Sequence, residues 1–140
     1  MGAENDLPIP ERAREFLTGM RIGYISTMRP DGHMSVVPVG IVRDGDVLKI
    51  STLSDRQKVR NLERDRRITV CVPDPENPRT YVEIRGVAEL ADDSDRAYID
   101  SFAREYMGVD KYPYDPPGAA RTTITVRASR VSMPKVHGSG

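Results

Sequence analysis

Two Asp-Gly pairs constrain the fold of this chain more than any other feature of its sequence. They lie at residues 31–32 and 44–45, and each separates two segments rich in β-branched and apolar residues. Asp-Gly favours the tight turns of β-hairpins because glycine adopts positive φ without strain. The sequence therefore predicts three consecutive antiparallel strands, over residues 21–28, 34–42 and 47–52.

Further strands and helices are predicted along the rest of the chain, and short turns make the sheet mostly antiparallel. A barrel removes the exposed edges of such a sheet. We therefore expect one mainly β domain with helices (α+β) over residues 1–140, with an N-terminal arm at 1–9 and a flexible tail at 134–140. Three more strands are expected, at 68–72, 79–90 and 121–133. Three helices are expected, at 8–20, from 54 onward and at 91–108. The helix at 8–20 has an apolar stripe of Ala13, Phe16, Leu17 and Met20.

Pro38 lies in the middle of the second expected strand, where a central strand needs every backbone N–H. Proline has no N–H to donate. Its position indicates a bulge, a sheet edge, or a place where the strand meets something other than another strand.

The composition argues against several classes of function. Lys and Arg total 21, as do Asp and Glu, and the chain has two Phe and no Trp. These values favour neither nucleic-acid binding nor a stacking platform for bases. No apolar run approaches membrane length, and the first ten residues lack the apolar core of a signal peptide.

Cys71 is the single cysteine, which excludes an internal disulfide and fits a reducing cytoplasm. It lies within an apolar strand pattern, so we expect a buried, inert thiol. His33 and His137 are far apart in the sequence and have no visible carboxylate or cysteine partner. The sequence predicts neither a metal site nor a catalytic dyad or triad.

The helix that begins after residue 53 is unusually basic at its start. Ser54 and Gln57 have the spacing of a capping box, and Val59 and Leu62 are its clear apolar anchors. The positive side chains lie at the positive end of the helix dipole, which is unfavourable by itself. An anion such as phosphate bound between them would offset this repulsion. From the residues alone, a solvated charged surface is an equally good interpretation. The basic residues at the helix start are Arg56, Lys58 and Arg60, and Ser51 and Thr52 at the preceding strand end can supply hydroxyl donors to the anion.

The order of these segments resembles a known family. The meander, the pattern R-x-K-x-R-N-L-x-R-D-R-R at 56–67 and the segment YVEIRGVAEL at 81–90 resemble the split β-barrel flavin-binding proteins that include the pyridoxamine 5'-phosphate oxidases. The basic pattern is most similar to the actinobacterial branch, which uses the deazaflavin coenzyme F420 in place of FMN. The resemblance covers residues 22–90 well and the last strand more loosely.

This resemblance implies a six-stranded FMN-binding split barrel that works as a homodimer with two sites at the interface. The strand end and the basic helix would bind the cofactor phosphate, and the second strand would lie along the cofactor ring. Arg60, Arg64, Arg66 and Arg67 would suit the anionic tail of F420. The implied cofactor residues are Val36, Val37, Pro38, Val39, Ser51, Thr52, Arg56, Lys58 and Asn61, with Arg79 and Tyr81 from the partner chain.

The function implied is F420H2-dependent reduction of a small unsaturated or conjugated acceptor, which the sequence does not identify. Tyr24, Tyr81 or water is the candidate proton donor. The alternatives are an FMN-dependent oxidoreductase and a non-catalytic flavin- or F420-binding protein, while haem binding ranks lower because it favours an axial histidine. The proline-rich loop at 109–120 is expected either to connect the last strand or to cover the substrate side.

Overall fold

The computed structural model describes residues 6–134, and all the expected helices and strands lie within this part. Residues 1–5 of the expected arm and residues 135–140 of the expected tail lie outside it. The elements are α1 (Glu11–Phe16), β1 (Met20–Met28), β2 (Met34–Asp44), β3 (Val47–Leu53), α2 (Gln57–Arg64), β4 (Arg67–Pro73), β5 (Tyr81–Asp92), α3 (Ala97–Tyr106) and β6 (Arg121–Ser132).

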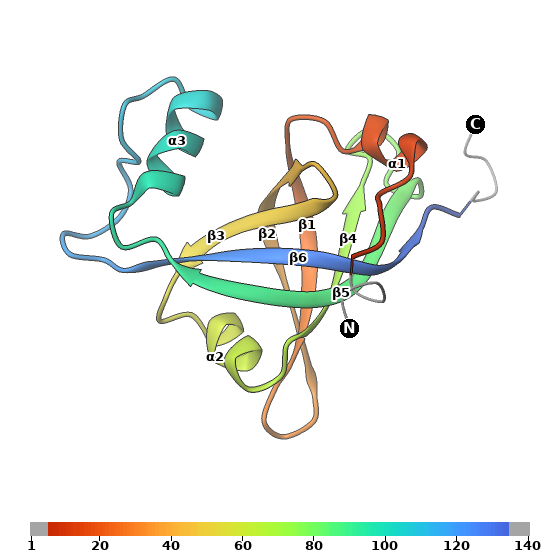
Figure 1. Cartoon of the computed structure of the whole chain (residues 1–140), viewed down its shortest axis with the longest axis horizontal. Coiled ribbons are helices and arrows are strands. Elements are labelled where there is room, and N and C mark those ends of the chain that lie inside the picture. The colour runs from red at the N-terminus through yellow and green to blue at the C-terminus, as the bar shows by residue number, and fades with distance from the viewer. Residues whose placement is uncertain (1–5, 135–140) are drawn as a thin grey trace.

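The strands form a closed antiparallel barrel in the order β1-β2-β3-β6-β5-β4, and β4 pairs with β1 to complete it (Figure 1). The predicted meander of β1, β2 and β3 is confirmed. Gly32 and Gly45 have φ values of 88° and 62° in its two turns, which explains the Asp-Gly pairs. The mainly β barrel expected from the sequence is therefore the fold of this chain.

Two seams of the barrel, where neighbouring strands pair, are short. β1 pairs with β4 only from Tyr24 to Ser26, and β2 pairs with β3 only from Val42 to Asp44. Beyond its short seam β2 continues along β1 alone and separates from β3, which pairs with β6 instead. Pro38 lies in this separated stretch and has a strand partner on one side only, Tyr24. The interpretation of Pro38 as a residue at a sheet edge is confirmed.

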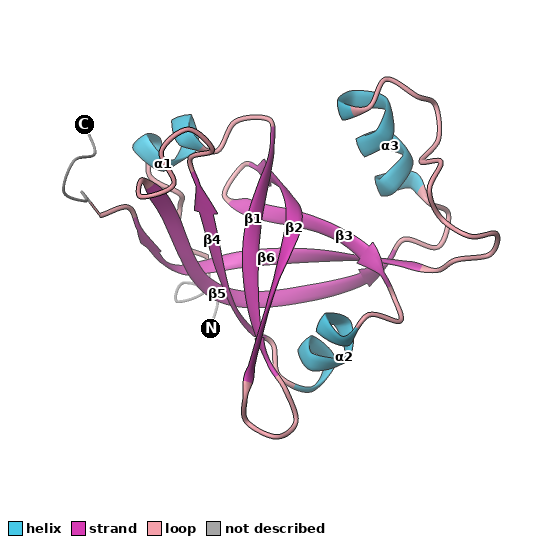
Figure 2. Cartoon of the chain, turned by 180° about the vertical axis from the view of Figure 1, so that it is seen from behind, coloured by secondary structure: helices cyan, strands magenta, loops and turns pink. Residues whose placement is uncertain are grey.

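The core fills the barrel with the inward-facing residues of all six strands. Leu62 of α2 is fully buried in this core, as are Ala13 of α1 and Ile9 just before it. In the two views of Figures 1 and 2, α1 and α2 lie at opposite ends of the barrel, and α3 projects near the end of β5 and the start of β6. Helix α2 thus packs its few apolar residues inward, while most of its charged residues face outward and Lys58 is partly buried.

The capping-box prediction for α2 was wrong. The residue at the N-cap is Arg56, and no side chain of the described residues caps the helix. The hydroxyl of Ser54 lies instead 2.7 Å from that of Thr122 on β6, and Gln57 donates a hydrogen bond to Asn61 at 2.8 Å. Ser54 is still held against β6, since its N–H bonds to the Ala120 carbonyl, so its hydroxyl faces the sheet.

The other two helices are shorter than the sequence predicted. α1 ends at Phe16, and Met20 begins β1 because Gly19, with φ of 67°, turns the chain between them. α3 begins at Ala97, since residues 91–92 extend β5. The carboxylate of Asp93 accepts hydrogen bonds from the backbone N–H groups of Tyr98 and Ile99 in the first turn of α3, at 3.0 and 2.9 Å, and so helps to fix where this helix starts.

The prediction of a buried Cys71 also needs correction. Its side chain is only partly buried on β4, in register with Tyr24 of β1 and Glu83 of β5. Partial burial raises the pKa of the thiol, and the negative charge of Glu83 raises it further. The thiol therefore stays protonated at neutral pH, which agrees with an unreactive cysteine.

Candidate functional site

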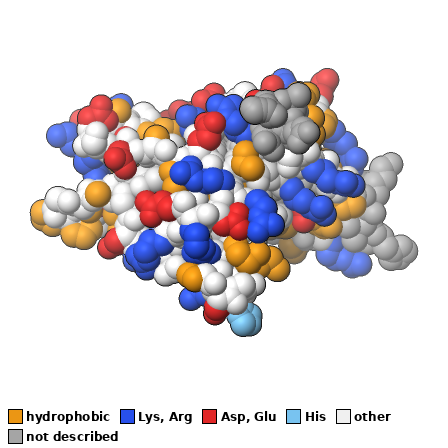
Figure 3. Space-filling view, turned by 60° about the horizontal axis from the view of Figure 1, so that its bottom comes forward, with side chains coloured by type: hydrophobic (Ala, Val, Ile, Leu, Met, Phe, Trp, Pro, Cys, Tyr) orange, Lys and Arg blue, Asp and Glu red, His pale blue; other side chains and the backbone are white. Residues whose placement is uncertain are grey.

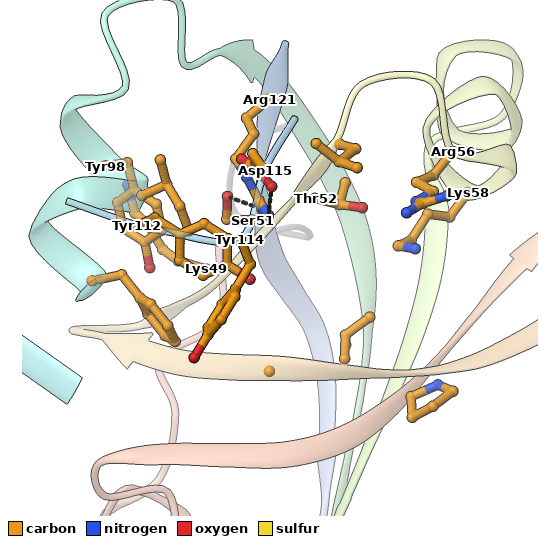
Figure 4. Close-up of a pocket in the computed structure, with 16 residues that line it drawn as sticks. Lys49, Ser51, Thr52, Arg56, Lys58, Tyr98, Tyr112, Tyr114, Asp115 and Arg121 are labelled. Carbon is orange, nitrogen blue, oxygen red and sulfur yellow. Dashed lines mark hydrogen bonds and ion pairs between the residues drawn. The ribbon is translucent and has the colours of Figure 1, made fainter. Parts of the chain in front are cut away.

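A pocket of about 400 Å³ opens where β2 and β3 separate (Figure 4). One wall is the edge of β2 from Pro38 to Gly40, and the floor is β3 from Lys49 to Leu53. The start of α2 borders the pocket at one end. Helix α3 and the loop that follows it border the other end. The missing β2–β3 pairing is thus what leaves room for a ligand.

The end of the pocket next to α2 is basic. Figure 4 shows the nitrogen atoms of Arg56 and Lys58 turned toward the hydroxyl of Thr52. Among residues 6–134 neither cation forms an ion pair. Burial lowers the pKa of Lys58, and the positive charge of Arg56 lowers it further. Two like charges held together in this way are stabilised by an anion between them.

The opposite end of the pocket is aromatic. Tyr98 comes from α3, and Tyr112 and Tyr114 come from the loop, with their rings edge to face at 5.6 Å between centroids. The ammonium nitrogen of Lys49 lies 5.9 Å from the centre of the Tyr98 ring. Burial, with several nearby negative groups, raises the pKa of Tyr98 to about 12, so this phenol is protonated at neutral pH.

A buried ion cluster joins the loop to the barrel. The carboxylate of Asp115 accepts hydrogen bonds from Arg121 at 2.6 and 2.9 Å and from Arg96 at 2.9 Å. Arg121 also donates to the hydroxyl of Ser51 at 3.1 Å and lies 4.6 Å from the ring centre of Tyr112. These hydrogen bonds, that of Arg121 above all, lower the pKa of Asp115. The cluster holds the tyrosine-bearing loop against β3.

Sequence reasoning did not find this cluster or Lys49. Asp115 lies in a proline-rich loop that reads as a surface connection, and Arg121 opens an ordinary strand. The pairing of Arg121 with Ser51 depends on the β3–β6 register, which no short motif encodes. The tyrosines of the loop were the one signal that pointed to this side of the site.

The structure brings part of the predicted site together and leaves part of it elsewhere. Val37 packs against the core, while Val36 points outward and is 63% exposed. Arg79 lies in the turn before β5 and Tyr81 is the first residue of that strand, and neither residue lines the pocket. The predicted residues that line the pocket are Pro38, Val39, Ser51, Thr52, Arg56 and Lys58.

Asn61 lies inside the protein rather than in the pocket. Its side chain is fully buried, donates to the hydroxyl of Thr27 at 3.0 Å and accepts from Gln57 at 2.8 Å. The bond to Thr27 joins α2 to β1, and both bonds satisfy a buried amide that would cost stability if it had no partners. Asn61 therefore positions the helix that carries Arg56 and Lys58.

The additional basic residues of the 56–67 pattern have partners within the protein. Arg60 donates to the Asp55 carbonyl at 2.6 Å, and Arg64 donates to the carbonyl of Met28. Arg67 forms an ion pair with Asp65 at 2.7 Å. On the face that Figure 3 shows, basic and acidic side chains are interspersed. Arg56 and Lys58 thus differ from their basic neighbours in having no such partner among the described residues.

Residues 6–134 contain neither a candidate metal site nor a helix that could span a membrane. No group of three or more His, Cys, Asp or Glu side chains that could hold a metal ion is found there. His33 is exposed near Asp31, with 3.4 Å between nitrogen and carboxylate oxygen, and His137 lies outside the described residues. None of the described helices is both long and apolar enough to cross a membrane.

Comparison with known proteins identifies the family. The family model described as pyridoxamine 5'-phosphate oxidase matches residues 9–133. The chain belongs to the pyridoxamine 5'-phosphate oxidase family. A solved structure named F420 reductase is 32% identical to this chain, with a TM-score of 0.75, and the match covers 89% of this chain and 98% of that one.

Two more distant structures share the fold of this pyridoxamine 5'-phosphate oxidase family member. General Stress Protein 26 from Bacillus anthracis is 19% identical, with a TM-score of 0.64 and coverage of 94% of this chain and 92% of that chain. A heme binding protein from Mycobacterium smegmatis is 21% identical, with a TM-score of 0.67 and coverage of 94% and 57%. No curated protein matches the sequence. The resemblance to the split-barrel family inferred from the sequence is confirmed.

Proposed function

We propose that this protein is an F420-dependent reductase whose cofactor phosphate binds between Arg56 and Lys58. The observation that carries the proposal is the pair of cations at one end of the pocket, which have no acidic partner in the described chain. The 32% identity to a protein named F420 reductase supports the choice of F420 over FMN. The single cysteine agrees with a cytoplasmic protein.

The remaining pocket residues suit the other parts of this cofactor. The Thr52 hydroxyl at the basic end would donate to the phosphate. Ser51 accepts a hydrogen bond from Arg121, and its own O–H is available to a ligand. The edge of β2 at Pro38 and Val39 offers apolar side chains to the ring, since within residues 6–134 no strand pairs with this stretch on that side.

When bound, reduced F420 supplies a hydride to an unsaturated acceptor, which takes a proton from water or from a tyrosine. Tyr98 is protonated at neutral pH and lines the same pocket. Among the described residues the protein offers no nucleophile–base pair in the pocket, so its part is to bind, orient and shield the reactants.

The proposed reductase is a homodimer. The outer surface of β1 and β2 carries exposed apolar side chains, among them Ile22, Tyr24 and Val36. This surface continues to Pro38 at the rim of the pocket, so a second copy bound there would border the site. The partner's Arg79 and the partner's Tyr81 are the residues proposed to complete it.

Titration of the protein with F420 and with FMN, followed by cofactor fluorescence, tests the proposal. Arg56→Ala and Lys58→Ala each remove a charged hydrogen bond, so each should weaken F420 binding about tenfold or more. Arg12→Ala removes one exposed positive charge from α1, at the other end of the barrel, and should leave binding unchanged.

Tighter binding of FMN than of F420 would move the protein to the flavin-dependent alternative. Binding of neither cofactor would contradict the proposed function. Binding without turnover of any acceptor would favour the non-catalytic binding protein.

A further inference from the structure

The aromatic end of the pocket contains a cation that the proposed phosphate site does not use. Lys49 lies on β3, and within residues 6–134 it forms no ion pair. Its distance of 5.9 Å from the Tyr98 ring is at the outer limit of a cation–π contact. Asp44 and Glu105 border an adjoining hollow that Lys49 also lines, yet neither is paired with it. A positive charge lies here without a close counter-ion.

Several aromatic side chains line the same pocket as this cation. Tyr98 comes from α3, and Tyr112 and Tyr114 come from the loop (Figure 4). Phe102 of α3 also lines the pocket. Tyr114 is 74% exposed although it packs edge to face on Tyr112, so much of its ring remains open to contact. Rings arranged in this way bind flat conjugated molecules by stacking and edge contacts.

The loop that carries two of these rings is held in place before any ligand binds. The backbone N–H of Tyr112 donates to the Asp100 carboxylate at 2.9 Å, and Asp115 is bonded to both Arg96 and Arg121. A wall fixed in this way loses little conformational entropy on binding, which favours affinity.

The charges of the pocket favour a negatively charged ligand at both ends. Four cations and one carboxylate line it, and that carboxylate, on Asp115, is already bonded to Arg121 and Arg96. Lys49 and Thr52 are three residues apart along β3, or roughly 10 Å. The two ends are thus far enough apart for two anionic groups that belong to different molecules.

We propose that the aromatic end binds the acceptor, and that the acceptor is a flat, conjugated molecule with a carboxylate that pairs with Lys49. This inference rests on the proposed function, because it assigns the second substrate of the same pocket. Lys49 is then a specificity-determining residue, and neutral acceptors of the same shape bind less tightly.

Two matched probes test the charge preference, 2-naphthoate and 2-naphthamide, with binding measured by calorimetry to the protein with and without F420. The carboxylate probe should bind at least fivefold more tightly than the amide. Lys49→Met should abolish this difference and leave amide binding and F420 affinity unchanged. Lys49→Arg should retain it. Lys111→Met, an equal loss of charge at an exposed position of the loop, should have no effect.

Equal binding of the two probes, binding of neither, or an equal loss of both in Lys49→Met would overturn the inference. Weaker F420 binding in Lys49→Met would place Lys49 in the cofactor site and would also overturn it. If F420 does not bind while the naphthoate preference persists, the proposed cofactor fails and the carboxylate site remains. The two failures are therefore distinguishable.

Discussion

Lys58 is held in the folded protein at a cost to stability. Its pKa is lower than the usual 10.5, because burial and the charge of Arg56 both disfavour the ammonium. The destabilisation is fully present below the folded pKa and is relieved as pH rises toward 10.5. Such an arrangement is typical of binding sites, where function rather than stability accounts for the residue.

We therefore expect Lys58→Met to raise the melting temperature at neutral pH while F420 binding is lost. The difference from the wild type should shrink as the pH rises, because the wild-type lysine then loses its proton. Thermal unfolding between pH 7 and pH 10 measures this. Lys111→Met, at an exposed site, serves as the control. A variant less stable than the wild type at pH 7 would contradict the account of Lys58.

Asp115, in contrast to Lys58, stabilises the folded protein. Its side chain is 7% exposed and that of Arg121 is 8% exposed, so Asp115→Asn would leave a buried guanidinium without its counter-ion. We expect a loss of about 3 kcal/mol in unfolding free energy, measured by urea denaturation at pH 7. Because the folded pKa of Asp115 is lowered, its contribution is present above the usual 3.8 and is lost as pH falls toward the folded value.

The variant should accordingly lose stability less steeply than the wild type in the acid range. Asp31→Asn, which changes an exposed carboxylate at a hairpin turn, should have a much smaller effect at pH 7. Equal effects of the two substitutions would show that the buried cluster does not stabilise the loop.

At the scale of elements, β5 requires glycine at one position. The register between β5 and β6 shifts between Arg85 and Gly86, and a Cβ atom on Gly86 would lie 1.9 Å from the carbonyl oxygen of Arg127. Backbone atoms cannot move away as a flexible side chain can. We expect Gly86→Ala to cost about 1–3 kcal/mol or more in unfolding free energy.

Gly40→Ala is the matched control in another strand. Its Cβ would meet the sulfur of Met20 at 3.4 Å, an ordinary contact, and its φ is not positive. Urea denaturation of both variants compares them directly. If Gly86→Ala were as stable as Gly40→Ala, the close approach of β5 and β6 would not exist in solution.

The sequence predicted the helices and strands better than it predicted the side-chain contacts between residues far apart in the chain. The Asp-Gly turns and the alternation of Ile124, Val126 and Ala128 depend on neighbours along the chain, and the strands they predicted are present. The cap of α2 was mispredicted because Ser54 bonds to Thr122, which is 68 residues away. The ion cluster and the Lys49 end were not found for the same reason: strand register brings their residues together, and no local pattern encodes it.

At the scale of the whole molecule, the exposed apolar surface of β1 and β2 is the basis of the proposed homodimer. Ile22 and Val36 are 56% and 63% exposed, and burial against a second copy would remove both from water. We expect the double variant Ile22→Glu and Val36→Glu to sediment as a monomer in analytical ultracentrifugation, and to bind F420 more weakly because the proposed site is shared.

Leu7→Glu introduces the same charge at an apolar position that is 38% exposed, outside β1 and β2, and should leave the dimer intact. A wild-type protein that sediments as a monomer at micromolar concentration would contradict the proposed dimer. The proposed phosphate site at the start of α2 would then have to function within one chain.

The two short seams of the barrel have a further consequence. The hairpin of β1 and β2 is joined to β4 by three residue pairs and to β3 by three, whereas β5 and β6 share a long ladder. Such a segment opens as a unit at a lower free energy than the rest of the protein. Its amide hydrogens should therefore exchange with solvent together and early. The proposed ring-binding edge and the proposed dimer surface both lie on this hairpin, so occupancy of either should slow exchange across all of it.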